Sequence, residues 1–323
     1  MNEWKVDVPV LLIFFCRPQT TAKVFEQIKL ARPSKLFLFQ DGPRTDRPDD
    51  LDKVMECRRI VEDIDWECEV YKCYHEKNIR QEKKVSFVPS VFIAFKWAFS
   101  HVDRCIVLED DDVPAQSFFP FCTELLERYK DDERINMICG WNFMGERLDI
   151  PYDYFFSVRG ATGWATWKRV IDEASETYDF LDDEYALKQL VELPGCFRLS
   201  PQWVNMCTAK RLSKVAHHEA IFGGLAFLNS RLNIIPSRNM ISNIGIGEDA
   251  THTQNECGTQ ASIFNMKTHE ICFPLRHPKY VINDSMYCDF AQTMPSSFVS
   301  FGKRMFNQLI KLCAGLNGKH KHG

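Results

Sequence analysis

The sequence predicts an α/β fold built on a Rossmann-like, doubly wound and mostly parallel sheet. Two observations support this prediction. Short β-rich runs alternate with amphipathic stretches through the first 140 residues, and some runs, such as 105–108, are wholly apolar. Such runs are typical of parallel strands buried on both faces. A repeated βα order joins parallel strands by right-handed crossovers.

The elements of this half follow in order. We expect strands at 8–15, 36–40, 67–74, 104–108 and 135–140. Helices are expected between them at 20–30, 51–64, 88–100 and 117–129, with Thr20 and Ser117 as capping residues. Asp41-Gly42-Pro43 indicates a turn after the second strand.

The remaining sequence divides into a second half and a tail. Residues 141–295 are less regular, with helices expected at 185–192 and 220–230 and strands at 154–158 and 233–235. We expect this half to pack on the first without a flexible linker. Residues 296–323 carry no Asp or Glu and place apolar residues at helical spacing. This pattern is typical of a basic amphipathic helix on an anionic membrane surface, although a helix docked on the core is an alternative.

Composition excludes several classes of protein. The 40 Lys and Arg against 44 Asp and Glu give a net charge of −4, which argues against a general nucleic-acid coat protein. Aromatic residues make up 13% of the chain, which argues against disorder. The 13 Cys form no CxxC pair, so we expect a reduced, cytoplasmic protein without zinc-ribbon or redox motifs. No apolar run approaches the length of a membrane span, so the protein is expected to be soluble or peripheral.

An acidic run, Glu109-Asp110-Asp111-Asp112, directly follows the apolar run at 105–108. Four adjacent carboxylates repel each other and need a cation or solvent. Ligands of doubly wound sheets bind at the carboxyl ends of the strands. A divalent ion there would be held by one or two carboxylates and by phosphate oxygens of the substrate. The alternative is a solvated helix start, where acids are also favoured.

Two further strand ends are expected to meet the acidic run. Arg17 follows the first strand and has the donor fork that suits phosphate. Asp41 follows the second strand and can accept hydrogen bonds from a base or a ribose. Together these three strand ends predict a nucleotide-diphosphate site. The EF-hand, dinucleotide, Walker, zinc-deaminase and HExxH patterns are all absent.

From residue 9 to about 289, the ordered motifs resemble those of bacterial GT-A glycosyltransferases related to the N-acetylglucosaminyltransferase I family. The motifs that carry the resemblance are Phe15-Cys16-Arg17-Pro18, Phe39-Gln40-Asp41-Gly42-Pro43, Val107-Leu108-Glu109-Asp110-Asp111, Ser117-Phe118-Phe119, Gly163-Trp164-Ala165-Thr166-Trp167, Ile241-Ser242-Asn243-Ile244-Gly245 and Gly247-Glu248-Asp249-Ala250-Thr251-His252-Thr253. The acidic triplet alone is common, whereas the ordered set is specific.

The resemblance implies a GT-A fold with a nucleotide-sugar-binding half at 1–140 and an acceptor-binding, catalytic half at 141–295. It implies a metal-dependent inverting transfer of a sugar, with GlcNAc favoured, from a UDP-sugar to a glycan or lipid-linked glycan acceptor. The setting would be bacterial surface polysaccharide synthesis, on the inner face of the cell membrane. Mn²⁺ or Mg²⁺ would be the cofactor, and no nucleic acid would be bound.

The resemblance also assigns roles to residues. It makes Asp111 a metal ligand, with His252 as a second ligand or diphosphate contact. The nucleotide would contact Cys16, Arg17, Asp41, Glu109 and Asp110, and the donor and acceptor pocket would include Gly163, Trp164, Glu248 and Asp249. Trp164 and Trp167 would suit a sugar-stacking platform, although core packing is an equal alternative for Trp167.

The catalytic base of the family lies in a Trp-Asp motif before a helix, where this chain has His218-Glu219. We therefore expect Glu219 to be the base, with an ordinary acid at a helix start as its alternative. Asp182-Asp183-Glu184 is a rival carboxylate cluster, with a solvated helix start as its alternative. The departure from Trp-Asp leaves open a second function, a catalytically inactive sugar-nucleotide-binding scaffold of a glycan-assembly complex. A nucleotidyltransferase would need a Gly-rich signature after the first strand, which is absent.

Overall fold

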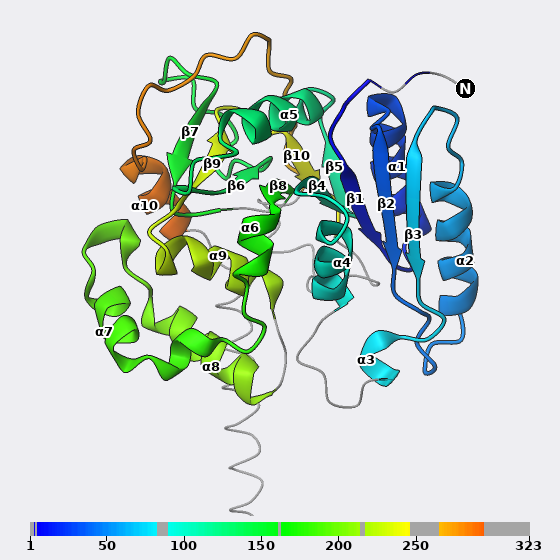
Figure 1. The fold of residues 1–323 in the computed structure, drawn as a ribbon, viewed down its shortest axis with the longest axis horizontal. Helices are drawn as coiled ribbons and strands as arrows, with labels where there is room; N and C mark the ends of the chain where they lie inside the picture. Colours follow the sequence, from blue (N-terminus) through cyan, green and yellow to red (C-terminus); the bar gives the residue numbers. More distant parts are fainter. Residues whose placement is uncertain are drawn as a thin grey trace, which may run out of the picture.

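The computed structural model describes Glu3 and residues 5–82, 90–160, 163–213, 217–245 and 265–293, without the side chains of residues 82, 219, 292 and 293. It is an α/β structure around an eight-stranded sheet of order β3-β2-β1-β4-β8-β6-β9-β7 (Figure 1). The strands are β1 Val10–Phe14, β2 Lys35–Gln40, β3 Glu69–Tyr74, β4 Arg104–Glu109, β6 Ile135–Cys139, β7 Tyr154–Ser157, β8 Trp164–Trp167 and β9 Leu232–Pro236. Strands β7 and β8 run opposite to the others.

Helices cover both faces of this sheet. They are α1 Pro18–Ala31, α2 Asp50–Val61, α3 Ile79–Glu82, α4 Ser90–Phe99, α5 Phe118–Arg128, α6 Lys168–Asp172, α7 Glu184–Glu192, α8 Pro201–Leu212, α9 His218–Leu228 and α10 Ser285–Thr293. Alternate side chains of β1 enter opposite cores, because successive residues of a strand point to opposite faces. Val10, Leu12 and Phe14 pack with α1, α2 and α5, whereas Leu11 and Ile13 lie in the core that contains α4, α6 and α9.

The predicted α/β class and the mostly parallel, doubly wound sheet are confirmed. Every strand predicted within the first 140 residues is present, with ends shifted by at most a few residues. The prediction missed β8, which inserts antiparallel between β4 and β6. Strands β7, β8 and β9, all from residues beyond 140, complete the same sheet. Residues beyond 140 therefore contribute three strands to the sheet that the first 140 residues begin.

The predicted cap at Thr20 is wrong, whereas Ser117 stands at the N-cap position of α5 without a side-chain hydrogen bond to the helix. Helix α1 begins at Pro18, whose fixed φ suits the first helical turn, and Thr20 lies inside that turn. Ser117 precedes α5, but its side chain does not cap the helix. Its hydroxyl instead accepts a hydrogen bond from Ile271 N at 2.9 Å, while Glu270 accepts from Ser117 N at 2.7 Å and from Gln116 N at 3.1 Å. The carboxylate of a distant segment therefore replaces the local cap.

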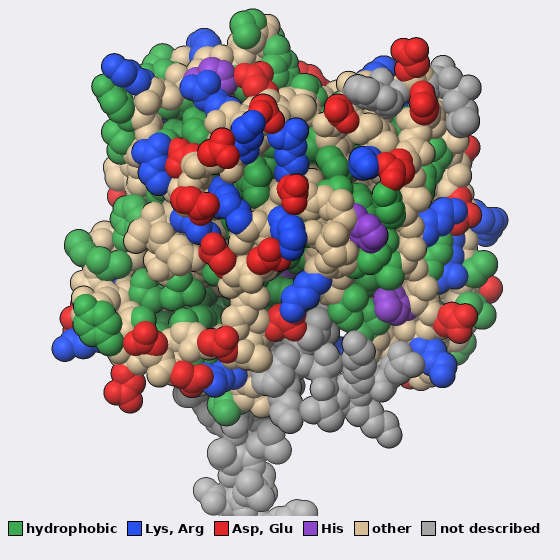
Figure 2. Space-filling model, in the orientation of Figure 1, with side chains coloured by type: hydrophobic (Ala, Val, Ile, Leu, Met, Phe, Trp, Pro, Cys, Tyr) green, Lys and Arg blue, Asp and Glu red, His purple; other side chains and the backbone are tan. Residues whose placement is uncertain are grey.

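The surface has no single-sign patch on the side drawn in Figure 2, where cationic and anionic side chains are interspersed. None of the helices within the described residues has both the length and the apolar content that crossing a bilayer requires. The predicted basic tail, residues 296–323, lies outside the described residues.

Candidate functional site

The carboxyl ends of β2, β1 and β4 lie side by side. Phe14 pairs with Gln40 and Ile13 pairs with Glu109, so the three strands end at one edge of the sheet. The residues that follow them are therefore neighbours in space, as the sequence predicts.

Arg17 lies at the centre of this edge. Its Nη1 is 2.9 Å from Asp111 Oδ2, and its Nη2 pairs with Asp110 Oδ1. The backbone N–H of Phe15 donates to Asp110 Oδ2 at 3.2 Å. The donor fork that the sequence assigns to phosphate is thus held by two carboxylates, which fixes Arg17 against the acidic run.

Burial raises the pKa of both aspartates in this cluster. For Asp111 the pKa rises to about 7, because burial and the negative charges of Asp110 and Glu109 outweigh the opposing effect of Arg17. Burial likewise raises the pKa of Asp110, against the effect of Arg17. Burial alone would lower the pKa of Arg17, but the two carboxylates raise it above its ordinary value. One guanidinium therefore serves several carboxylates, and the cluster carries an excess of negative charge only when all of them are ionised.

A small second sheet closes over Asp111. Strand β5, Asp112–Pro114, pairs antiparallel with β10, Ile241–Asn243. Asn243 Nδ2 donates to Asp111 Oδ1 at 3.3 Å and to Asp112 Oδ1 at 3.0 Å. A Cβ atom on Gly245 would lie 2.1 Å from Asp111 Oδ2, so a side chain there would displace the carboxylate. Glycine at 245 is therefore required by close approach.

The segment that follows Gly245 carries three predicted site residues, Glu248, Asp249 and His252. All three lie outside the described residues. The last described residues before this segment lie against Asp111. Gly245 approaches its side chain closely, and Ile244 N donates a hydrogen bond of 2.8 Å to Asp111 O.

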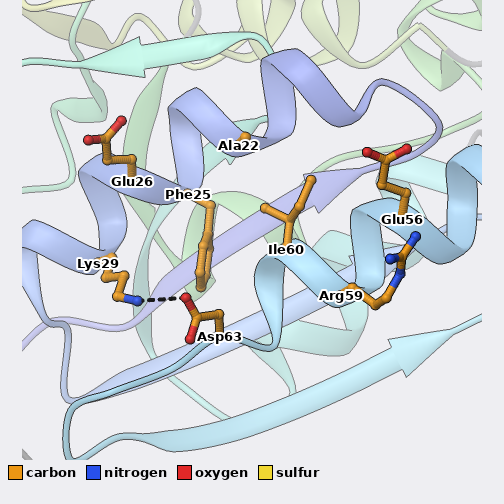
Figure 3. A pocket seen from close by; sticks show the side chains of 8 residues that line it. All are labelled: Ala22, Phe25, Glu26, Lys29, Glu56, Arg59, Ile60 and Asp63. Atoms are coloured by element: carbon orange, nitrogen blue, oxygen red, sulfur yellow. Dashed lines mark hydrogen bonds and ion pairs between the residues drawn. The ribbon is translucent and has the colours of Figure 1, made fainter.

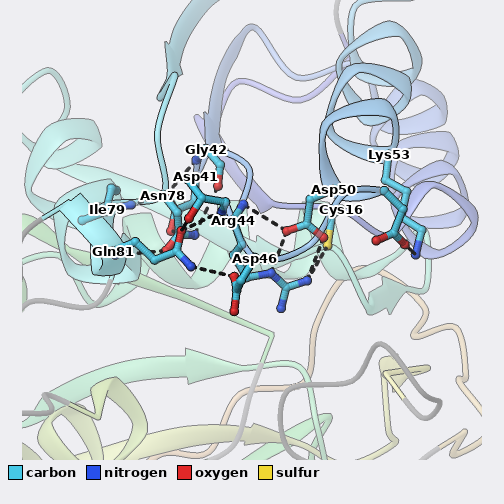
Figure 4. Close-up of polar contacts among 12 residues, drawn as sticks. Cys16, Asp41, Gly42, Arg44, Asp46, Asp50, Lys53, Asn78, Ile79 and Gln81 are labelled. Atoms are coloured by element: carbon cyan, nitrogen blue, oxygen red, sulfur yellow. Dashed lines mark hydrogen bonds and ion pairs between the residues drawn. The ribbon is translucent and has the colours of Figure 1, made fainter.

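Asp41 forms the turn after β2 (Figure 4). Its Oδ1 accepts hydrogen bonds from Gly42 N at 2.7 Å and Ile79 N at 2.8 Å, and Asn78 Nδ2 lies 3.3 Å from Oδ2. Burial raises the pKa of Asp41 in spite of these backbone donors. The carboxylate therefore fixes the loop that leads to α3. Its oxygens already accept hydrogen bonds from the protein, before any ligand binds.

Cys16 and Arg44 lie beside each other at the end of β1 (Figure 4). Cys16 is 3% exposed, and Arg44 Nη2 is 3.8 Å from its Sγ. Arg44 also donates hydrogen bonds to the buried Asp50, from Nε at 2.6 Å and from Nη2 at 2.8 Å. Its guanidinium carbon lies 5.2 Å from the centre of the Phe15 ring. Sequence reasoning missed Arg44, although it directly follows the Asp41-Gly42-Pro43 turn.

The amino-terminal end of α9 brings the other half of the chain to the acidic run. His218 Nε2 lies 3.2 Å from Glu109 Oε1. Glu219, the predicted base, follows in the first helical turn, two residues after the N-cap residue His217; its side chain lies outside the described set. His218 has no role predicted from the sequence. The signal that could have found it is its position, because His218 stands where the resembled family has the Trp of its Trp-Asp motif.

Gly163 directly precedes β8, and Trp164 is its first residue. Trp164 pairs with Val107 and Cys139 in the sheet and is only 6% exposed. Its ring packs 5.2 Å from that of Phe95 and 5.5 Å from that of Phe222. The indole therefore belongs to the core and supports the site from beneath rather than offering an open stacking face.

Two other sequence alternatives are settled by their contacts. Trp167 is 5% exposed and donates its indole N–H to Leu126 O at 3.1 Å, which is core packing. In the rival acidic cluster, Asp183 caps α7 by accepting from Ala186 N at 2.9 Å, and Asp182 pairs with Arg211. These carboxylates form a helix start, as their alternative interpretation predicts.

The donor atoms at the strand ends suit a hard divalent ion only in part. Among the described residues, no group of three or more His, Cys, Asp or Glu side chains converges as a ready metal site. Asp111 nonetheless offers carboxylate oxygens within a cluster of excess negative charge. A site of one carboxylate, completed by substrate phosphate oxygens, fits this arrangement.

Two surface hollows lie elsewhere. One of about 420 Å³ separates α1 from α2, where Lys29 pairs with Asp63 over Phe25 and Ile60 (Figure 3). Another of about 260 Å³ is lined by Arg147, Asp153 and Arg276 among others. Neither includes a residue from the carboxyl ends of β1, β2 or β4, so the candidate site rests on converging chemistry and not on cavity size.

No protein-family model matches this sequence, and no curated protein matches it significantly.

Proposed function

We propose that the chain is a metal-dependent inverting glycosyltransferase that uses a UDP-sugar, with GlcNAc as the favoured donor sugar. The observation that supports this most is the buried carboxylate cluster at the carboxyl edge of the sheet, held by Arg17 and closed over by Asn243 and Gly245. Buried carboxylates at the expected ligand crevice suit a divalent cation, and the cation would in turn attract a diphosphate.

Asp111 would hold Mn²⁺ or Mg²⁺, and the ion would supply charge neutralisation to the departing diphosphate. His252 is proposed as a further ligand. Arg17, Asp110 and Glu109 would border the nucleotide, and the Asp41 turn with Cys16 would lie against the uridine. Arg44, which is partly exposed beside Cys16, would add positive charge at the same end.

The proposed reaction is a direct displacement. The acceptor hydroxyl oxygen attacks the anomeric carbon, its proton passes to the carboxylate of Glu219, and the bond from the anomeric carbon to the diphosphate oxygen breaks. UDP leaves with the bonding electron pair. The acceptor would be a glycan or lipid-linked glycan of bacterial surface polysaccharide synthesis, reached at the inner face of the membrane.

Release of UDP from a panel of UDP-sugars, with Mn²⁺ and with EDTA, tests the proposal. We expect Mn²⁺-dependent turnover that Asp111→Asn abolishes. Asp63→Asn, which removes a surface carboxylate paired with Lys29, serves as the matched control and should retain wild-type turnover. Turnover that resists both EDTA and Asp111→Asn would show that the metal assignment is wrong.

Two observations favour the alternative of an inactive sugar-nucleotide-binding scaffold. The Arg17 fork is already occupied by Asp110 and Asp111, and His218-Glu219 stands where the resembled family has Trp-Asp. Binding of UDP with Mn²⁺ but no transfer across a broad panel of donors and acceptors would support the scaffold.

A further inference from the structure

His218 is held on three sides at the start of α9. Its Nε2 lies 3.2 Å from Glu109 Oε1, and the two side chains are 17% and 31% exposed. The ring meets Phe95 of α4 edge to face at 6.0 Å between centroids. On another side it stacks with His217, again at 6.0 Å and with planes 9° apart. The imidazole therefore has a fixed place between the end of β4 and the core.

The first turn of α9 is itself anchored to the core. Phe222, one turn after His218, stacks on Phe92 at 5.5 Å and meets Phe95 edge to face at 5.4 Å. His217 N donates to Tyr178 Oη at 2.8 Å. Helices α4 and α9 lie on the same side of the sheet (Figure 1). Apolar contacts thus hold the helix to α4, while His218 links its amino-terminal end to the acidic run.

We propose that His218 is a positioning residue that fixes the spacing between Glu109 and Glu219. This inference rests on the proposed function, which places Glu109 beside the nucleotide and makes Glu219 the catalytic base. Glu109 immediately precedes the Asp110–Asp111 cluster, and Glu219 immediately follows His218 in the chain. A fixed His218–Glu109 contact therefore fixes the backbone of the base relative to the donor site. A misplacement of about 1 Å at such a distance can cost about 100-fold in rate.

Two substitutions separate this role from ordinary packing. His218→Phe keeps an aromatic ring against Phe95 but loses the contact with Glu109. His218→Gln places an amide N–H where Nε2 lies and keeps a donor to Glu109. The matched control is His101→Phe, because His101 makes ring contacts with Phe37 and Tyr71 at 5.9 and 4.9 Å away from the site.

We expect His218→Phe to lower kcat about 10- to 100-fold with donor KM within about 3-fold of wild type. His218→Gln should recover most of the loss, and His101→Phe should match wild type. The double variant Glu109→Ala with His218→Phe should be no worse than the more impaired single variant, because both substitutions break the same contact. Wild-type kcat in His218→Phe would overturn the proposal. A loss in His218→Gln equal to that in His218→Phe would also overturn it and would indicate that the imidazole itself accepts the proton.

A second measurement separates this proposal from the proposed function. If the wild-type chain releases no UDP from any donor, the proposed function fails. Amide hydrogen exchange at His217 and Ile221, whose N–H groups donate to Tyr178 Oη and His217 O, still tests the contact when it is measured without substrate. We expect faster exchange there in His218→Phe and unchanged exchange in His101→Phe. Unchanged exchange in both variants would overturn the positioning role.

Discussion

Asp111 makes the stability of this protein depend on pH in a defined direction. Its pKa rises from an ordinary 3.8 to about 7 on folding, chiefly because the carboxyl group is buried. The folded state therefore binds more protons than the unfolded state between these values, and the group destabilises the fold increasingly as pH rises through that window. Asp111→Asn removes this dependence.

The size of the effect follows from the two pKa values. Proton linkage from 3.8 to about 7 gives a cost of about 2 kcal/mol at pH 5 and about 4 kcal/mol at pH 8. The free energy of unfolding of Asp111→Asn, relative to wild type, should therefore increase by roughly 2–3 kcal/mol from pH 5 to pH 8. The pKa of about 7 already includes the effect of Arg17, so the trend with pH needs no separate correction for the lost ion pair.

Urea unfolding with EDTA present, at intervals from pH 5 to pH 8, measures this difference. Asp63→Asn again serves as the control, because its carboxylate lies 75% exposed on the surface. The reasoning is refuted if wild type and Asp111→Asn show parallel curves. We also expect Mn²⁺ at pH 8 to restore the stability of the wild type but not of the variant. That result would link the ionised Asp111 carboxylate to cation binding.

Two further predictions concern the segments that close the site. Gly245→Ala should weaken Mn²⁺-dependent UDP binding at least about 10-fold by calorimetry, because its Cβ would lie 2.1 Å from Asp111 Oδ2. Gly223→Ala, where a Cβ meets nothing within 4 Å, should leave binding unchanged and so provides the control. Glu270→Ala should lower the free energy of unfolding by about 2–4 kcal/mol in urea, since it removes two hydrogen bonds to a carboxylate, including the bond from Ser117 N. An unchanged midpoint would contradict that capping role.

The sequence was sufficient for the strand ends and insufficient for what covers them. Apolar runs and turn signals located β1, β2 and β4, and parallel order then brought Arg17 to Asp110 and Asp111. Strand β8 escaped prediction because its four buried residues, interrupted by a polar Thr166, have neither the length nor the alternation of a recognisable strand. Its place is set by pairing with β4 and β6, which sequence periodicity does not encode.

Long-range partners explain the rest of the differences. Glu270 replaces a local cap from 153 residues away, and His218 meets Glu109 across more than a hundred residues. No local propensity signals such contacts, since they depend on the full topology. The sequence shows the acidic run but not its partner. Arg17 is predicted to bind phosphate, whereas in the structure it pairs with Asp110 and Asp111.

That exchange of partners bears directly on how a nucleotide diphosphate would bind. Glu109, Asp110 and Asp111 carry three negative charges when ionised, and Arg17 offsets one of them. A diphosphate placed here would add further negative charge to a buried cluster whose pKa values are already raised by the cost of ionisation. Either a divalent cation must accompany the diphosphate, or Arg17 must turn to the phosphate and leave two aspartates that then bind protons. The first route keeps Asp110 and Asp111 ionised and leaves their contacts with Arg17 intact. The charge count alone therefore favours binding of the cation and the nucleotide as one complex.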